Sequence, residues 1–374
     1  MSAFDVCVRG SGAVAMAAAL SLSRLGLAVA WTGARHPGAA PAEAAAPDVR
    51  AYALNAASVA LLSTLKVWDG LPADARTPVL DMRVDGDARS AAAHFSAWSV
   101  GAAQLAWIVD AAELDTALAA ALRYAPHVTV VADGADAALQ VLAEGRDSAA
   151  RQRLGVQMPV HGYGQRGLAA RLRADRSHGG LARQWFRSPD VLALLPFDRP
   201  APGCSYGLVW SLPDERAQAL QQADAAAFEA ALAEATGGAA GRLQLAGERA
   251  SWPLALAQAH TVCGPGWVLL GDAAHRVHPL AGQGLNLGLA DVAELARQLA
   301  AREPWRGLGD ERLLQRYARA RRLPTQAMEL LTDGLLHLFA HQGGWARELR
   351  NRGLNLVDHL PPLKRALVRR AMDA

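Results

Sequence analysis

The stretch from Gly271 to Gly288 constrains the fold of this chain more than any other part of it. The apolar run 267–270 before it predicts a short buried strand. Apolar residues at helical spacing between Leu287 and Leu299 predict an amphipathic helix behind it. Between them lies a polar loop with glycines that let backbone approach a flat ligand, and the helix start offers unpaired N–H groups to an anionic or electron-rich group. With Asp272 placed to bind a polyol or ribose, the stretch predicts a site for a large nucleotide cofactor with a planar ring.

A second glycine-rich turn lies near the N-terminus. Residues 4–8 and 27–31 predict buried strands, with a helix between them. The first strand runs into the pattern G-x-G-x-x-A at Gly10, Gly12 and Ala15. In such a unit Gly10 permits the tight turn, Gly12 lets a pyrophosphate approach, and Ala15 keeps helix and strand close. The pattern alone is a weak signal, but between a strand and a helix it predicts a dinucleotide site.

The second predicted strand lacks the carboxylate that usually ends such a strand. Gly33 stands in its place, and Arg9 directly precedes Gly10, where a small or apolar residue is expected. Losing a charged hydrogen bond to the adenosine ribose costs about 1.5–3 kcal/mol, which is about 10- to 100-fold in affinity. We therefore expect weaker cofactor binding or a substitute group, and we include Arg35 among the predicted cofactor-binding residues.

Composition excludes several other classes of protein. With 374 residues and 52% hydrophobic content, the chain can form one large domain or two interleaved ones. Its net charge of +3 does not indicate nucleic acid as a partner. Cys7, Cys204 and Cys263 form neither metal spacing nor a disulfide framework, so we expect no metal and a reduced, cytoplasmic location. We find no signal-peptide pattern and no long uncharged run typical of a membrane span.

These motifs resemble known ones. The Gly271–Gly288 stretch resembles the second flavin-binding motif of class A flavoprotein monooxygenases, and its segment 278–288 is most similar to their ubiquinone-biosynthesis hydroxylase branch. The pattern R-x-x-x-L-N-x-x-S from Arg50 resembles the same branch. Gly145, Ser148 and Arg151 also match a motif of the family, although Glu144 stands where the family usually has Asp. Ordinary structural roles are alternatives to cofactor binding in both cases. Arg50 fits a solvated charge at the start of a helix, and the last motif fits a turn capped by Ser148.

The resemblance implies an α/β fold. In it, a Rossmann-like FAD-binding part of the para-hydroxybenzoate hydroxylase type is interleaved with a substrate-binding β-sheet and followed by C-terminal helices. We expect a helix to begin near Val49, and aromatic strands between 156 and 255. The expected segments are 1–78, 106–158 and 256–320 for FAD binding, 79–105 and 159–255 for the substrate sheet, and 321–374 for the C-terminal helices.

The resemblance also implies an activity. Family members use NAD(P)H and O2 to hydroxylate an aromatic ring through a flavin C4a-hydroperoxide, and this branch acts on a polyprenylated phenol in ubiquinone biosynthesis. Two alternatives stay open: a soluble aromatic substrate, or a degenerate, non-catalytic component of a quinone-biosynthesis complex. Residues 345–374 carry seven basic and three acidic side chains. This basic end makes that complex and the surface of the inner membrane candidate partners, although a solvated helix face explains it equally well.

Site residues follow from the resemblance. It implies that Asp272 holds the ribityl chain, that Pro279 and the backbone 282–286 flank the isoalloxazine, and that the N-terminal turn holds the pyrophosphate. Arg50, His275 and Pro279 are the candidate catalytic residues, with no confident acid or base among them. The predicted cofactor-binding residues are Gly10, Gly12, Ala15, Arg35, Arg50, Gly145, Gly271, Asp272, Pro279, Gly282, Gln283, Gly284, Leu285 and Asn286.

Overall fold

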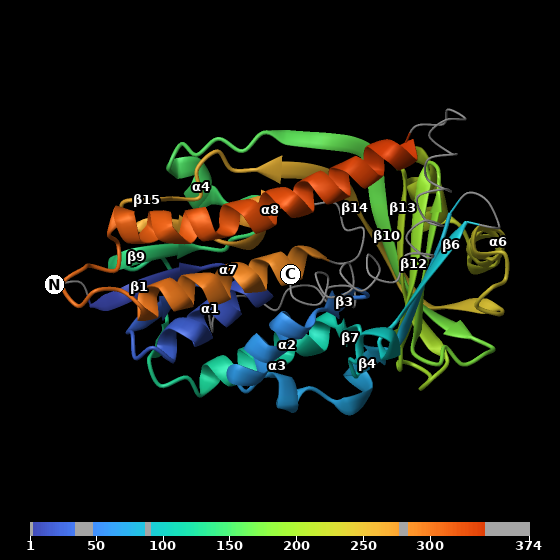
Figure 1. Cartoon of the computed structure of the whole chain (residues 1–374), viewed down its shortest axis with the longest axis horizontal. Helices are drawn as coiled ribbons and strands as arrows, with labels where there is room; N and C mark the ends of the chain where they lie inside the picture. Colours follow the sequence, from blue (N-terminus) through green and yellow to red (C-terminus); the bar gives the residue numbers. More distant parts are fainter. Residues whose placement is uncertain (1–2, 34–47, 87–90, 277–282, 341–374) are drawn as a thin grey trace.

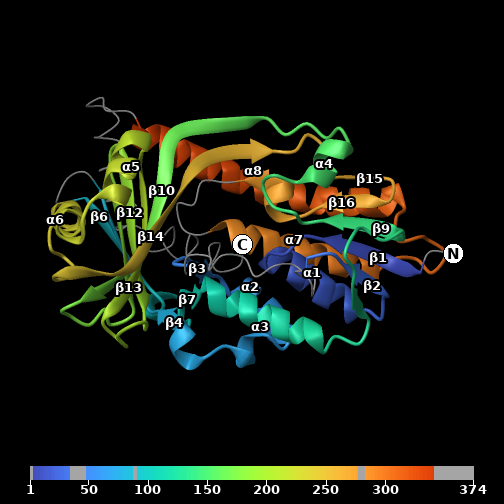
Figure 2. The same cartoon turned by 180° about the vertical axis from the view of Figure 1, so that it is seen from behind.

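The computed structural model describes residues 3–33, 48–86, 91–276 and 283–340. Figure 1 shows two parts beside each other, a layered α/β part that contains α1, β1 and α7, and a part built on the long strands β10 and β14. The same arrangement is seen from behind in Figure 2, where α8 again extends from the first part toward the second. No helix of the described residues is both long enough and apolar enough to cross a membrane.

The α/β part contains a six-stranded sheet in the order β15-β16-β9-β1-β2-β8. Because β1 pairs in parallel with both β2 and β9, and α1 (Ala13–Ser23) connects β1 to β2, the predicted βαβ unit is confirmed. The strands are β1 (Phe4–Arg9), β2 (Val29–Trp31), β8 (Val128–Val130), β9 (Ala137–Leu142), β15 (Cys263–Gly264) and β16 (Trp267–Leu269).

Helices cover this sheet and form the largest hydrophobic core with it. They are α1, α3 (Ala111–Arg123), α7 (Gln283–Ala300) and α8 (Glu311–Ala340). The apolar residues that predicted α7 by their helical spacing are buried, as Val292 illustrates, and Leu118 of α3 is buried in the same core. Nearly all side chains of α1 are buried, which accounts for its almost uniformly apolar sequence.

The second part is an eight-stranded sheet in the order β17-β14-β10-β13-β12-β11-β5-β6. Its neighbours pair antiparallel except β11 and β5, and β11, β12 and β13 form a meander within the region where aromatic strands were expected. Helices α5 (Asp214–Gln222) and α6 (Ala225–Thr236) contact one face through a core that includes Trp210 and Phe228. The strands are β5 (Asp81–Asp85), β6 (Ala92–Ser96), β10 (Val160–Ala174), β11 (Leu181–Arg187), β12 (Asp190–Phe197), β13 (Ser205–Pro213), β14 (Leu243–Gln258) and β17 (His275–Arg276).

A three-stranded sheet, β3 (Ala51–Leu54), β7 (Ala106–Asp110) and β4 (Arg76–Val79), corrects one prediction. The helix expected from Val49 is wrong over its first residues, because the backbone of β3 pairs antiparallel with β7. Helix α2 (Ala56–Thr64) begins only after Asn55, whose side chain accepts a hydrogen bond from the Ser58 N–H at 2.8 Å. Shorter elements are α4 (Ala149–Arg153), η1 (Trp68–Gly70), η2 (Ala73–Ala75), η3 (Trp98–Val100) and η4 (Gly271–Ala273).

Candidate functional site

A cavity of about 810 Å³ is lined by both parts of the molecule. One wall comes from the α/β part: the start of α1, the turn after β9, the turn after β16 and the start of α7. The opposite wall comes from β10, β13 and β14, and the segment Asp48–Tyr52 closes a third side. This volume lies within the range typical of cofactor and ligand sites.

The start of α1 provides a binding place for an anion. Gly12 is the N-cap residue and lines the cavity together with Ala13 and Val14, and no side chain of the described residues caps this helix. By contrast, Asp110 caps α3 and Ser148 caps α4. The first N–H groups of α1 therefore keep their hydrogen-bonding capacity and the positive end of the helix dipole. A Cβ on Gly12 would meet nothing within 4 Å, so the space above it belongs to the cavity.

Gly10 and Ala15 lie behind the cavity wall rather than on it. Gly10 has φ +132°, and a Cβ there would lie 2.1 Å from the Ala143 carbonyl oxygen. Ala15 is completely buried. These two residues therefore bring β1, β9 and α1 close together, as the motif predicts, and among the three motif positions Gly12 is the one that lines the cavity.

The missing carboxylate at the end of β2 has a steric reason. The indole Nε1 of Trp31 donates a hydrogen bond to the Gly10 carbonyl at 2.8 Å. A Cβ on Gly33 would lie 1.9 Å from that same carbonyl oxygen and 2.5 Å from the indole nitrogen. An acidic side chain at position 33 therefore has no room. Arg9 donates a hydrogen bond to Gln140 of β9 at 3.3 Å, and Arg35 lies outside the described residues.

Gly33→Ala is expected to lower the free energy of unfolding by about 1–3 kcal/mol, because the added methyl group overpacks this contact. Urea unfolding of the purified protein measures the change. Gly70→Ala is the matched control, since a Cβ there meets nothing within 4 Å; its effect should stay within about 0.5 kcal/mol. Equal stability of both variants would contradict the close packing of Gly33 on Gly10.

The turn after β16 presents Asp272 to the cavity. Asp272 is exposed and belongs to the cavity wall, whereas Gly271 before it is buried with φ +59°. Gly284 and Leu285 at the start of α7 line the cavity beside it. A carboxylate in this position accepts hydrogen bonds from a polyol chain. Pro279 and Gly282 lie outside the described residues, as does the side chain of Gln283.

Asn286 holds the site together instead of facing the cavity. Its side-chain oxygen accepts hydrogen bonds from the Asn55 N–H at 3.1 Å and the Ser58 hydroxyl at 2.8 Å. Its amide nitrogen donates to the Ala53 carbonyl at 2.8 Å. Asn286 thereby ties the start of α7 to the junction of β3 and α2, which fixes the distance between two walls.

The turn after β9 is well ordered by Glu144, although the related motif usually has Asp there. A carboxylate oxygen of Glu144 accepts from the Ser148 hydroxyl at 2.7 Å and from the Ala150 N–H at 2.9 Å. Buried Arg151 donates to the Ala273 carbonyl at 3.2 Å, which joins this turn to the one that carries Asp272. Gly145 lines the cavity with φ +77°.

Arg50 lines the cavity from the start of β3 and is paired with Asp48. The guanidinium donates to both carboxylate oxygens, at 2.9 and 2.6 Å. Burial would raise the pKa of Asp48, but the hydrogen bonds and charge of Arg50 lower it overall. Burial raises the pKa of neighbouring Tyr52 to about 12, so this cavity-lining phenol stays protonated. Burial also raises the pKa of nearby Asp115 to about 6.

Arg171 of β10 joins the eight-stranded sheet to the Arg50 segment. Its guanidinium donates to the Arg50 carbonyl at 2.7 Å and to the Asp110 carboxylate at 3.1 Å. It stacks over the Phe197 ring at 4.1 Å. Burial lowers the pKa of Arg171. The sequence motifs did not indicate this residue, although a charged side chain among the apolar residues of β10 was an available signal.

His275 is buried on Asp291 of α7 and is not part of the cavity wall. The structure therefore places it behind the turn that carries Asp272, where it does not meet a bound ligand directly. Asp291 and its second partner, Arg321, were not predicted as site residues. The available signal for Asp291 was a carboxylate within the apolar stripe of α7, four residues before Leu295.

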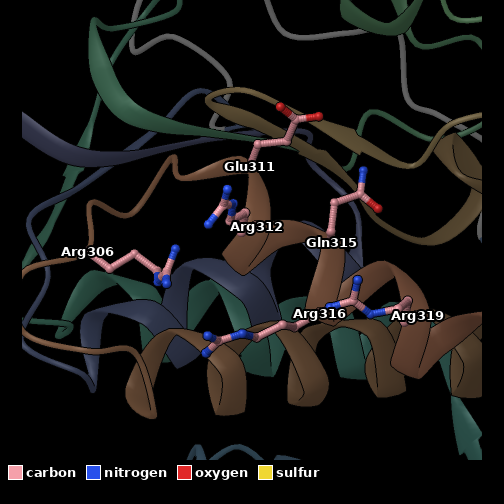
Figure 3. A pocket seen from close by; sticks show the side chains of 6 residues that line it. All are labelled: Arg306, Glu311, Arg312, Gln315, Arg316 and Arg319. Atoms are coloured by element: carbon pink, nitrogen blue, oxygen red, sulfur yellow. The ribbon is translucent and has the colours of Figure 1, made fainter.

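A second hollow, of about 520 Å³, lies at the start of α8 and is shown in Figure 3. Arginine side chains dominate its lining, and two of them are already neutralised: Arg306 pairs with Glu303 and Asp310, and Arg316 pairs with Glu303. Among the described residues, its lining shares none with the large cavity. Of these two cavities, the large one is therefore the one at which the glycine-rich turns meet.

Comparisons with known proteins agree with this geometry. A family model described as an FAD binding domain matches residues 106–332. The ubiquinone hydroxylase UbiL of Rhodospirillum rubrum is 32% identical, covering 98% of this chain and 89% of the relative. The 3-demethoxyubiquinol 3-hydroxylase of Escherichia coli is 30% identical, covering 98% of both chains.

Solved structures show the same fold. The p-nitrophenol 4-monooxygenase PnpA of Pseudomonas putida superposes with a TM-score of 0.77 at 16% identity, covering 100% of this chain and 99% of that one. Aklavinone-11 hydroxylase, solved with FAD and aklavinone, gives a TM-score of 0.66 at 19% identity, covering 90% and 69%. The predicted α/β fold and the FAD cofactor are thus confirmed, and the chain belongs to the FAD-dependent monooxygenases, in the family of the ubiquinone hydroxylases.

Proposed function

We propose that this enzyme uses NAD(P)H and O2 to hydroxylate the aromatic ring of a polyprenylated phenol in ubiquinone biosynthesis. The observation that carries the proposal is the polarity of the cavity: one wall offers helix N–H groups and a carboxylate, and the opposite wall is almost entirely apolar. A nucleotide cofactor fits the first wall, and a hydrophobic ring fits the second.

The residues present fit FAD. The uncapped start of α1 suits the diphosphate, Asp272 suits the ribityl hydroxyls, and the start of α7 at Gly284 and Leu285 suits the isoalloxazine. When bound, FAD supplies the redox and oxygen chemistry of this reaction. The protein contributes binding, orientation and exclusion of water. Arg35, Pro279, Gly282 and Gln283 keep their predicted roles within this proposal.

Small side chains at aligned positions of three adjacent strands form the apolar wall. Val209 of β13 and Ala250 of β14 both lie opposite Ala169 of the central strand β10. Beside this row, the Trp252 indole packs on Gly167, where a Cβ would lie 3.1 Å from its nitrogen. Small residues across three adjacent strands leave width for a substituted ring, and the row carries no acid or base.

Polar groups lie at the border of this wall. Arg50 and Arg276 provide positive charge, and Tyr52 provides a hydroxyl that is protonated at neutral pH. We assign Arg50 to the approach of the anionic nicotinamide nucleotide, with Asp48 and Arg171 holding it in place. We assign His275 to positioning of the Asp272 turn rather than to direct proton transfer, because it is buried on Asp291.

Ala169→Phe is expected to lower kcat/KM for a prenylated phenol at least about 10-fold, which corresponds to ~1.4 kcal/mol. The new ring would occupy the space between Val209 and Ala250. FAD affinity should stay unchanged, because the cofactor residues lie on the opposite wall. Steady-state kinetics and an FAD titration measure the two quantities. Unchanged kinetics would place the substrate elsewhere.

The proposed function is tested with purified protein, FAD, NAD(P)H, oxygen labelled with ¹⁸O and a short-chain prenylated phenol. Mass spectrometry should show one labelled oxygen in the ring. Incorporation into simple phenols alone would favour a soluble aromatic substrate. FAD uptake without any incorporation, together with loss of quinone intermediates in a deletion strain, would favour a non-catalytic member of a biosynthetic complex. Flotation with anionic vesicles tests the peripheral membrane contact suggested by the basic segment 345–374.

A further inference from the structure

Asp291 is a completely buried carboxylate with three hydrogen-bonding partners, two on the Asp272 turn and one on α8. One oxygen accepts from the Gly271 N–H at 2.9 Å and contacts His275 Nε2 at 2.7 Å. The other accepts from Arg321 Nε of α8 at 2.7 Å. Two of these partners flank Asp272 in sequence, at positions 271 and 275. The carboxylate therefore sits directly behind the turn that presents Asp272 to the cavity.

Arg321 makes a second contact that reaches the other flavin-facing element. Its NH2 group donates to the Leu287 carbonyl in the second turn of α7 at 3.2 Å. The same guanidinium thus holds both Asp291 and the beginning of the helix whose residues Gly284 and Leu285 line the cavity. Its side chain is largely buried, with 13% exposure. Asp291 and Arg321 together connect α8 to two elements of the cofactor wall, the Asp272 turn and the start of α7.

The charges around this carboxylate are complementary. Burial alone would raise the pKa of Asp291, but His275 and Arg321 lower it. Burial alone would lower the pKa of His275, whereas Asp291 raises it above its ordinary value; Arg321 opposes this change and Asp272 supports it. Asp291 is therefore ionised at neutral pH, and its charge favours the protonated form of His275.

We propose that Asp291 and Arg321 are positioning residues for the flavin: together they fix the Asp272 turn and the start of α7 in the geometry that binds the ribityl chain and the ring. This inference rests on the FAD site proposed above. Its consequence is that α8, none of whose described side chains lines the cavity, controls cofactor affinity from behind. The affected part of the cofactor is present in riboflavin as well as in FAD.

Full-length wild type, Asp291→Asn, Arg321→Met and Arg321→Lys are titrated with FAD and with riboflavin, following the quenching of flavin fluorescence. Asp291→Asn and Arg321→Met should weaken the binding of both flavins by a similar factor of about 10 to 100, because each variant loses charged hydrogen bonds that hold the turn. Arg321→Lys keeps the positive charge and should recover part of this loss. Arg319→Ala is the matched control, an exposed arginine of α8 without an ion pair among the described residues, and should bind like wild type.

A second readout separates positioning from general stability. In wild type, FAD affinity should fall as the pH rises through the raised pKa of His275, because the imidazolium loses its charge beside Asp291. His275→Gln should remove this alkaline step. Urea unfolding without flavin identifies any variant that is simply unfolded.

Equal flavin affinity of wild type, Asp291→Asn and Arg321→Met would overturn the inference, as would a loss confined to FAD. Failure of wild type itself to bind FAD would instead overturn the cofactor site proposed above.

Discussion

Replacing Gly12 by valine is expected to abolish FAD binding while the protein stays folded. The backbone at Gly12 has φ −84° and ψ 174°, which any residue adopts, and an added Cβ meets no protein atom within 4 Å. The side chain would instead occupy the space in front of the uncapped start of α1. We expect a loss of at least about 100-fold in affinity, or ~2.8 kcal/mol. The visible spectrum of the purified variant and an FAD titration measure it.

Urea unfolding of apoprotein provides the control, because Gly12→Val should unfold within about 0.5 kcal/mol of wild type. The FAD affinity of Gly12→Ala should lie between those of wild type and Gly12→Val. A Gly12→Val protein that purifies with one FAD per chain would show that the diphosphate does not approach α1 at this point.

Arg171→Leu is expected to lower the free energy of unfolding by about 3–5 kcal/mol. The substitution leaves the Asp110 carboxylate without its buried partner and the Arg50 carbonyl without a donor. Both groups lie where β10 meets β3 and the start of α3, so the loss falls on the junction between the two parts of the molecule. Urea unfolding followed by circular dichroism measures the effect.

Arg173→Leu is the matched control, two residues further along the same strand and exposed. It should change stability by less than about 0.5 kcal/mol. If the two leucine variants unfold at the same urea concentration, the ion pair at Asp110 contributes nothing to stability. Arg171 also holds the Arg50 backbone. A milder effect on stability together with a raised KM for NAD(P)H would therefore indicate that the main role of Arg171 is to position Arg50.

Local patterns predicted much of the fold. The turn at Gly10 and Gly12 has its strand–turn–helix context, and α7 follows its apolar periodicity because one face of the helix is buried. Asp272 also reaches the cavity as expected, since the residue after a buried strand lies at the edge of the sheet. These successes share a cause: each depends on residues that are close in sequence.

The failures depend on distant partners. Residues 51–54 have good helix formers, yet they form β3 because β7, more than 50 residues later, offers its backbone edge. The environment of His275 also depends on distant residues, because Asp291 and Arg321 lie 16 and 46 residues away in the sequence, and its catalytic role stays a prediction. Sequence spacing contained no information on which of these side chains would meet. Position 33 depends on tertiary packing in the same way. The packing of Trp31 on Gly10 explains why no acidic residue stands there.

The short strand β17 gives the molecule a mechanical property. His275 and Arg276 follow Asp272 by only a few residues, and they pair with Gln258 and Ala257 at the end of β14. Strand β14 also carries Ala250 and Trp252 of the apolar wall. The two walls of the cavity are therefore joined by a hinge of backbone hydrogen bonds at one edge. Because this pairing joins them, the position of the turn that carries Asp272 is coupled to the position of the apolar wall.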